Sequence, residues 1–454
     1  MGQVPSGVYR PRKPKASPLW QCLKEHFYWF LVDYPEKYEA KHGFLKPIVE
    51  ETVNKFLNCG DLKRGFARVK CPDCDKQYVL AFSCRGRWFC PSCHQKKVLL
   101  FGEFISAEVA FPVPHRQYVL TVPIRLRVYF RNNRKLLKKL CQSAHDSLLD
   151  FMRQSLRLPE GMPGMVMAIQ TFGDYVNFHP HLHALVADGL FTDTGLFYVM
   201  PEQSLRPLEE MFRARVLALV VKEGLLDPEA AENMLAWRHS GFHVHNGHRI
   251  ARDDKAGVER IAQYIIRNPF SEEKMTYSAE SAQVIYRSKP NPKTRRNFEV
   301  FTAGEFIAAI TQHIPDKGFQ MVRYYGWYSN KSRGVRKKKA AGQAGPPADD
   351  VAILDVSDPG RRKIPSKKWR ELIKKVWEVD PLKCPNCGGE MKMVNLTDDP
   401  RDIRALIEDW GLHEFVRDPP ARPPPGHATR RVTGWADDIV FDDGPFISED
   451  QDAA

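Results

Sequence analysis

The chain has 454 residues, enough for several domains and at least one large core. Lysine and arginine total 68 against 55 acidic residues, which gives a net charge of +13 and favours a polyanionic partner such as DNA. There is no run of about 18 apolar residues, which excludes a membrane-spanning protein, and no signal peptide, which disfavours a secreted disulfide scaffold. We therefore expect a cytoplasmic, nucleoid-associated protein.

The first 58 residues are predicted to form a basic arm followed by helices. Apolar residues recur at intervals of three and four between Leu19 and Leu31, and again between Phe44 and Leu57. The aromatic residues of the first stretch are more typical of a protein core than of a platform for stacked bases. Residues 1–58 are thus expected to be a helical DNA-binding segment.

Residues 59–98 are predicted to form a zinc-binding module. Two CxxC motifs lie there, separated by residues 75–89, and this spacing is typical of zinc sites with four thiolate ligands. The expected ligands of one structural Zn²⁺ are Cys71, Cys74, Cys90 and Cys93. Either Cys84 or His94 could replace one of them, and Cys59 is a further candidate.

Residues 99–335 are predicted to form an α+β domain around an antiparallel sheet, because strand and helix patterns alternate there irregularly. The main predicted elements are strands at 118–122 and 166–171 and helices at 136–156, 205–223 and 228–237. The second strand and the histidine-bearing strand that follows Gly173 are expected to form a hairpin in the middle of the sheet.

Three histidines at alternate positions of that next strand are the strongest functional signal. The side chains of His179, His181 and His183 point to one face, because successive residues of a strand alternate between faces. A purely structural role would require a hydrogen-bond partner for each of three imidazoles, so metal binding is the preferred interpretation. A second pair, His243 and His245, has polar flanks typical of a hairpin turn and ranks lower.

A helix predicted at residues 257–267 places Tyr264 beside its apolar stripe. Taken alone, this position is usual for a core tyrosine whose hydroxyl lies at the rim of the core. The helix therefore needs a second argument before its tyrosine can be given a chemical role.

Residues 323–339 mix cations with aromatic rings. This mixture suits single-stranded DNA, whose phosphates attract lysine and arginine and whose unstacked bases pack on flat rings; a solvated basic face is the alternative. The candidate DNA-binding residues, including one from the preceding helix, are Arg267, Arg323, Tyr324, Tyr325, Lys331, Arg333 and Arg336.

The C-terminal part is predicted to contain a linker at residues 336–364, then a helix and a single CxxC motif, Cys384-Pro-Asn-Cys387, within residues 365–415. This motif would need His413, His427 or another chain to complete a zinc site. Residues 416–454 are acidic and rich in proline and are expected to be disordered.

In this order, the two cysteine motifs, the run His179-Pro-His-Leu-His183, the segment Tyr264-Ile-Ile-Arg-Asn-Pro269, the segment 323–333 and the late Cys-Pro-Asn-Cys-Gly-Gly resemble a known family. They are similar to the bacterial rolling-circle insertion-sequence transposases, members of the His-hydrophobe-His endonuclease superfamily, over residues 20 to 410. The resemblance implies a ferredoxin- or RRM-like palm: a small antiparallel sheet with helices on one side, a central histidine strand and an adjacent tyrosine helix.

The resemblance also implies the site. His181 and His183 would be ligands of Mg²⁺ or Mn²⁺, and Tyr264 would be the nucleophile that forms a 5′-phosphotyrosine bond with single-stranded DNA at element ends and targets. The candidates for a third metal ligand are His179, Gln170, Gln263 and Asn268. Members with two tyrosines carry the other one four residues earlier; here Arg260 stands there, which favours one nucleophile used in turn and a phosphate contact from Arg260.

Two other functions stay open from the sequence. A replication initiator or relaxase shares the nicking core, but the zinc module ahead of the core favours a transposase. A non-enzymatic zinc-dependent DNA-binding regulator would explain the charge and the cysteines and leave the histidine strand unexplained. DNA is the expected partner in all cases, and a homodimer is a further option.

Overall fold

The computed structural model describes residues 14–86, 88–237, 239–290, 295–343, 370–371 and 380–409. The predicted basic arm before residue 14, residues 344–364 of the predicted linker, most of the helix predicted after it, His413, His427 and the acidic tail lie outside these residues. Residues 336–343 of the predicted linker are instead helical. None of the helices within the described ranges is long and apolar enough to cross a membrane.

The N-terminal helices pack on a small second sheet. They are α1 (Pro18–Lys37), α2 (Glu39–His42) and α3 (Pro47–Leu57), and the sheet, of order β10-β9-β8, consists of β8 (Met275–Ser278), β9 (Gln283–Arg287) and β10 (Phe298–Thr302), followed by α10 (Ala303–Thr311). Phe27 and Phe30 are buried in the shared core, as predicted, whereas Tyr28 and Trp29 are 68% and 62% exposed, so the core interpretation was wrong for these two. The apolar face of α1 thus serves chiefly to cover α10 and β8.

The zinc module forms a third sheet with a partner from the far end of the chain. Strands β1 (Phe66–Lys70) and β2 (Gln77–Ala81) pair with each other, and β12 (Lys392–Thr397) pairs with β1 on its other side. Helix α13 (Pro400–Asp409) covers this sheet through Ile403 and Ile407. Two regions that the sequence predicts as separate parts therefore share one fold, and α4 (Pro91–Phe104) with the π-helical turn η3 (Ile105–Val109) leads from it to the main domain.

The main domain contains a six-stranded antiparallel sheet of order β11-β4-β5-β3-β7, with β6 paired to β5. Its elements are β3 (His115–Thr121), α5 (Ile124–Asn132), α6 (Leu136–Leu156), β4 (Met162–Phe172), β5 (Phe178–Phe191), β6 (Phe197–Val199), α7 (Arg206–Lys222), α8 (Pro228–Ala236), β7 (His243–Asn246), α9 (Lys255–Ile265), β11 (Val322–Gly326) and α11 (Asn330–Gln343). The predicted α+β class and the central hairpin, β4 with β5, are confirmed. Both strands are buried almost throughout because helices lie over them.

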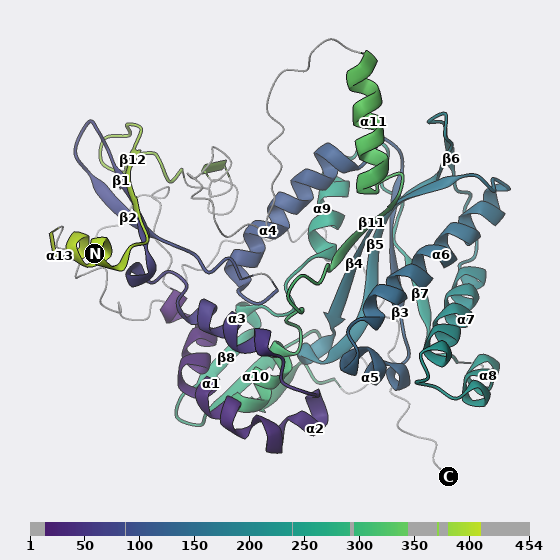
Figure 1. The fold of residues 1–454 in the computed structure, drawn as a ribbon, viewed down its shortest axis with the longest axis horizontal. Helices are drawn as coiled ribbons and strands as arrows, with labels where there is room; N and C mark the ends of the chain where they lie inside the picture. The colour runs from purple at the N-terminus through teal and green to yellow at the C-terminus, as the bar shows by residue number, and fades with distance from the viewer. Residues whose placement is uncertain are drawn as a thin grey trace.

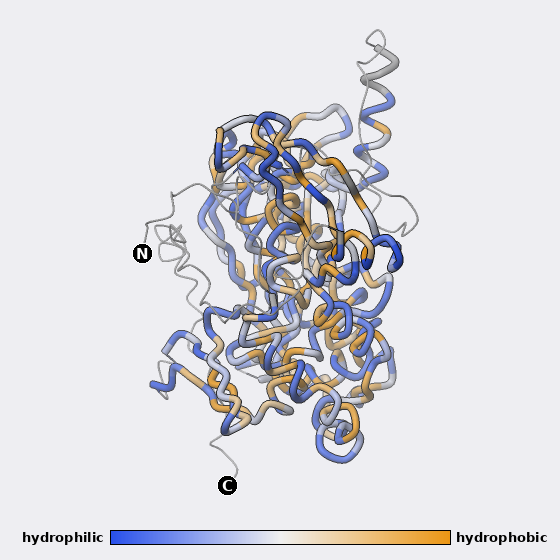
Figure 2. The backbone as a smooth tube through the Cα atoms, turned by 90° about the vertical axis from the view of Figure 1, so that its left-hand side faces the viewer, coloured by the Kyte–Doolittle hydropathy of each residue, from blue (hydrophilic) through white to orange (hydrophobic). Residues whose placement is uncertain are grey.

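Helices cover both faces of this sheet (Figure 1). On one face Tyr264 of α9 contacts His183, and on the other His145 of α6 stacks on Tyr325 at 4.5 Å between ring centroids. The expectation of helices on one side only is therefore wrong. The cause is visible in the burial of β4, whose residues from Pro163 to Phe172 are all buried: a strand apolar on both faces needs cover on both. Hydrophobic stretches run through the middle of the molecule (Figure 2).

Candidate active site

The three histidines of β5 lie buried on the face of the sheet that α9 covers. His181 pairs with Gln170 of β4 and Thr121 of β3, and residues paired across neighbouring strands project to the same side. Ring centroids of neighbouring imidazoles are 5.0 Å apart for His179 and His181 and 4.8 Å apart for His181 and His183. The predicted common face is confirmed.

Hydrogen bonds fix the proton position on one of these rings. Nδ1 of His181 lies 2.8 Å from the carbonyl oxygen of His179, and a carbonyl can only accept, so Nδ1 carries the proton and Nε2 keeps its lone pair. Nδ1 of His183 lies 2.8 Å from Nε2 of Gln117. Nε2 of His183 is buried and has no hydrogen-bond partner among the residues that the structure describes. Gln117 was not predicted as a site residue, because only the register of β3 with β5, in which Val119 pairs with His183, brings it to the histidine face.

The imidazoles are held in the neutral form. The pKa of His181 is lowered to about 4, chiefly by burial and also by the charge of Arg267, while the hydrogen bond to the His179 carbonyl acts in the opposite direction. Burial first, and then His181 and Arg267, lower the pKa of His183 well below its ordinary value. Neutral imidazole is the form that binds metal ions, so the site is ready for a cation at neutral pH.

Helix α9 brings Tyr264 to this face. Its N-terminus is capped by Asp254, whose carboxylate accepts from the backbone N–H of Gly257 at 2.7 Å. The partly buried Tyr264 ring meets His183 edge to face at 5.4 Å between centroids, and the Arg267 guanidinium lies 4.6 Å from the same ring. The tyrosine and the histidine strand, 81 positions apart between residues 183 and 264, are thus in direct contact.

The alternative tyrosines lie elsewhere. Tyr277 and Tyr286 belong to β8 and β9 of the second sheet. The Tyr277 hydroxyl bonds to Glu25, and the Tyr286 hydroxyl accepts from the backbone N–H of Ser271 at 3.1 Å. Both hydroxyls are occupied within the N-terminal core, so Tyr264 is the one of the three that faces the histidines.

Among the candidates for a third ligand, Gln170 has the most suitable geometry. Its Nε2 donates to the carbonyl of Ile265 at 3.0 Å, while its buried Oε1 has no partner within the described part of the chain. Gln263 instead bonds Glu259 and lies against Gly102 of α4, where a Cβ atom would come within 2.5 Å of its Cγ. A strand rises about 3.3 Å per residue, so His179 and His183 are too far apart to share one ion.

Asn268, the remaining candidate, also has a buried side-chain oxygen without a partner in the described ranges, and its Nδ2 donates to the carbonyl of Phe270 at 2.8 Å. It follows the end of α9 instead of lying on the sheet, so no register places it opposite the histidines. Gln170, which pairs directly with His181, is therefore preferred.

The cysteines predicted to share one ion are divided between two clusters. Cys90 and Cys93 gather with Cys59 and Cys84, and Cys71 and Cys74 gather with Cys384 and Cys387; within each cluster all sulfur atoms lie within 4.8 Å of one another. The predicted grouping is wrong because β1 and β2 carry the first motif toward β12, away from the start of α4. Cys84 and Cys59, the predicted alternative ligands, join Cys90 and Cys93 in one cluster.

His94, the other predicted alternative ligand, connects the region of the Cys90 and Cys93 cluster to α9, the helix that carries Tyr264. Its ring is fully buried; Nδ1 accepts from the backbone N–H of Trp88 at 3.0 Å, and Nε2 donates to the carbonyl of Ile266 at 2.6 Å. Ile266 is the C-cap of α9. Both nitrogens are used, so His94 positions α9 relative to the cysteines and is not free to bind zinc.

We expect His94→Ala to lower the free energy of unfolding by about 2–4 kcal/mol, since it leaves two buried backbone groups without partners. Zinc content should stay unchanged. Urea unfolding followed by tryptophan fluorescence, with metal analysis of the folded protein, measures both, and the exposed His248→Ala serves as control. Loss of one zinc equivalent in His94→Ala alone would show that the ring is a ligand.

The predicted DNA-binding residues do not form one surface. Arg260 lies on α9 four residues before Tyr264, and its guanidinium is 3.4 Å from Asp254, whereas the exposed Arg267 follows the C-terminus of the helix. Arg333 and Arg336 stack on aromatic rings, at 5.4 Å from Tyr324 and 4.2 Å from Trp327. Lys331 is exposed on α11. Stacked arginines of this kind contribute to packing as well as charge.

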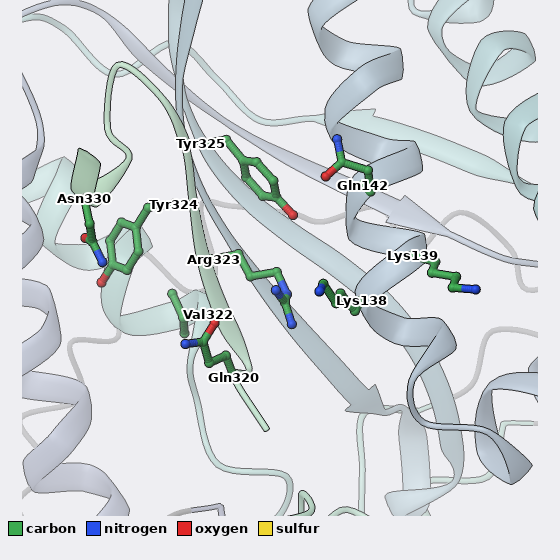
Figure 3. A pocket seen from close by; sticks show the side chains of 9 residues that line it. All are labelled: Lys138, Lys139, Gln142, Gln320, Val322, Arg323, Tyr324, Tyr325 and Asn330. Atoms are coloured by element: carbon green, nitrogen blue, oxygen red, sulfur yellow. The ribbon is translucent and has the colours of Figure 1, made fainter. Parts of the chain in front are cut away.

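Arg323 and Tyr325 lie on the face opposite the histidines, because they pair with Met167 and Met165. There they line a hollow of about 540 Å³ with Lys138 and Lys139 of α6 (Figure 3). Tyr324 points to the other side of β11 (Figure 3). The two lysines were not predicted as site residues, because the sequence pattern of α6 does not show which strand this helix covers.

Comparisons with known proteins show that the chain is similar to transposases. Residues 30–122 match the family described as "Transposase zinc-binding domain", and residues 164–336 match the family described as "Putative transposase". The transposase for insertion sequence element IS801 from Pseudomonas savastanoi pv. phaseolicola is 26% identical over 85% of this chain and 90% of its own length. "Putative transposase y4qJ" from Sinorhizobium fredii (strain NBRC 101917 / NGR234) is 23% identical over 80% of this chain and 94% of its own length. No solved structure matches the chain.

Proposed function

The chain belongs to the insertion-sequence transposases with a zinc-binding domain, and on that premise we propose that Tyr264 cleaves single-stranded DNA at the ends of the element. The observation that carries the proposal is the contact between the Tyr264 ring and His183, on a helix that Gln170 and His94 tie to the sheet and to the zinc module. A tyrosine that served only the core would not need an arginine guanidinium and a buried imidazole against its ring.

In the proposed reaction the Tyr264 hydroxyl gives its proton to water, and its oxygen attacks the scissile phosphorus as the bond to the 3′-oxygen breaks. The leaving 3′-oxygen takes up a proton from water, and the 5′-phosphate stays on the tyrosine. The phosphodiester energy is kept in this bond, so a 3′-hydroxyl of another strand can reverse the step and join the strands without ATP. With Arg260 at the place of a second tyrosine, one nucleophile acts in turn.

The histidine site fits a divalent cation. It would be held by the lone pair of His181 Nε2 and by two atoms without a hydrogen-bond partner in the described part of the chain, Nε2 of His183 and Oε1 of Gln170. A half-turn of the Gln117 amide would let its oxygen accept from Nδ1 of His183, which directs a lone pair to Nε2 in the way usual for metal-binding histidines. When bound there, Mg²⁺ or Mn²⁺ would offset the negative charge that develops on the phosphate oxygens.

Cations would hold the DNA on the two sides of the sheet. Arg260 and Arg267 would contact the phosphates next to Tyr264, since Arg260 precedes it by one helical turn on α9 and the Arg267 guanidinium lies 4.6 Å from its ring. Lys138, Lys139 and Arg323 would bind the strand at the edge formed by β11. The preference for single strands and a homodimer both remain predictions.

The test uses the purified chain with strands that cover the DNA flanking its gene, offered singly and as duplexes, with Mg²⁺, with Mn²⁺ or with a chelator. We expect a covalent protein–DNA adduct with single strands only, and none with chelator. Binding without cleavage would instead support the non-enzymatic regulator. Cleavage without an adduct would contradict the tyrosine mechanism.

A further inference from the structure

Each of the two cysteine clusters has enough ligands for a zinc ion of its own. Cys59, Cys84, Cys90 and Cys93 already supply four thiolates, the full set for a structural zinc ion. The other four cysteines, of which two lie beyond residues 30–122, are therefore left to be explained. We propose that Cys71, Cys74, Cys384 and Cys387 bind a second Zn²⁺, which fastens the C-terminal region to the N-terminal module.

The sulfur distances fit a shared ion. Sγ of Cys71 lies 3.5 Å from Sγ of Cys387, and Sγ of Cys74 lies 3.4 Å from Sγ of Cys384. Four sulfurs at about 2.3 Å from a tetrahedral zinc are about 3.8 Å apart, whereas a disulfide needs about 2.05 Å. Both short distances run between the two motifs, so each motif contributes two ligands to a common centre.

The two motifs share two backbone features. The N–H of Cys71 donates to the carbonyl of Lys76 at 2.8 Å, and the N–H of Cys384 donates to the carbonyl of Gly389 at 2.8 Å. In each motif the residue after the second cysteine is left-handed: Asp75 has φ of 55° and Gly388 has φ of 74°. Each turn presents two thiols at the CxxC spacing that is typical of four-cysteine zinc sites.

The surrounding fold indicates a structural role for the ion. Strand β12 begins at Lys392, soon after Cys387, and pairs with β1, which ends just before Cys71. The apolar contacts beside the cysteines involve few buried residues, chiefly Val69 and Met391. A module with so small a core commonly depends on a metal or disulfides for stability. We infer that the ion holds residues 380–409 in place.

The experiment is metal analysis of the full-length chain. We expect two zinc ions per chain in the wild type and one in the double variant Cys384→Ser/Cys387→Ser. The double variant Cys22→Ser/Cys141→Ser, which changes buried cysteines outside both clusters, should keep two. One zinc in the wild type, or two in the Cys384→Ser/Cys387→Ser variant, would overturn the proposal.

A second measurement does not depend on variants that fold. Wild-type protein reloaded with Co²⁺ should show ligand-field absorption of two tetrathiolate sites per chain, and absorption for a single site would overturn the proposal. Alkylation of the denatured, metal-free chain should label all ten cysteines. Four protected cysteines would mean two disulfides in place of the ion, which would also overturn it. These readouts do not involve DNA cleavage, so they can fail while the proposed function stands.

Discussion

Replacement of Tyr264 by phenylalanine is expected to eliminate the covalent adduct with single-stranded DNA and to reduce cleavage at least about a thousandfold, because the attacking oxygen is removed. The fold should be kept, since the ring contacts with His183 and Arg267 do not involve the hydroxyl. Denaturing gels of reactions with end-labelled strands measure the adduct, and circular dichroism checks the fold.

The matched control is Tyr277→Phe. This substitution removes a hydroxyl that bonds to Glu25 and lies 2.8 Å from Nε2 of His26, in the N-terminal core. It should leave adduct formation intact. If the adduct persisted in Tyr264→Phe and disappeared in Tyr277→Phe, the nucleophile would be misassigned.

Removal of either proposed metal ligand, in His181→Ala or His183→Ala, should reduce cleavage roughly a hundredfold or more, because the charge that offsets the reacting phosphate is lost. DNA binding should change little, since phosphate contacts elsewhere provide most of the affinity. Cleavage rates at several Mn²⁺ concentrations, together with binding isotherms, separate the two effects.

His243→Ala is the matched control for these variants. It changes a histidine of the other alternating pair, whose side chain is 61% exposed and lies 3.6 Å from Glu209. Cleavage should be close to that of the wild type. Equal loss of cleavage in His243→Ala, or full activity in His183→Ala, would show that the metal site lies elsewhere.

The parts of the fold that depend on local periodicity could be predicted from the sequence. Alternation placed His179, His181 and His183 on one face, and the short link after Gly173 indicated the central hairpin. The helix of Tyr264 was also predictable, since its apolar residues recur at helical spacing. Its contact with the histidines depended on the family resemblance, because no local pattern tells which strand a helix covers.

The parts that depend on distant pairing could not be predicted. Any CxxC motif can combine with any other, and only the pairing of β1 with β12 brings Cys71 next to Cys387, 316 positions away. The same limit applies to Gln117, which carries no signal in the sequence and becomes relevant only through the register of β3 with β5. Burial of α1 against α10 likewise joins segments more than 250 residues apart along the chain.

Peptide mapping of a trapped adduct tests the central claim most directly. The chain would be incubated with a single strand from the element end, digested with protease and nuclease, and analysed by tandem mass spectrometry for the residue that carries the nucleotide. The account predicts a phosphodiester on Tyr264 with the DNA attached through its 5′-phosphate. Attachment to Tyr277, Tyr286 or any other residue, or through a 3′-phosphate, would contradict it.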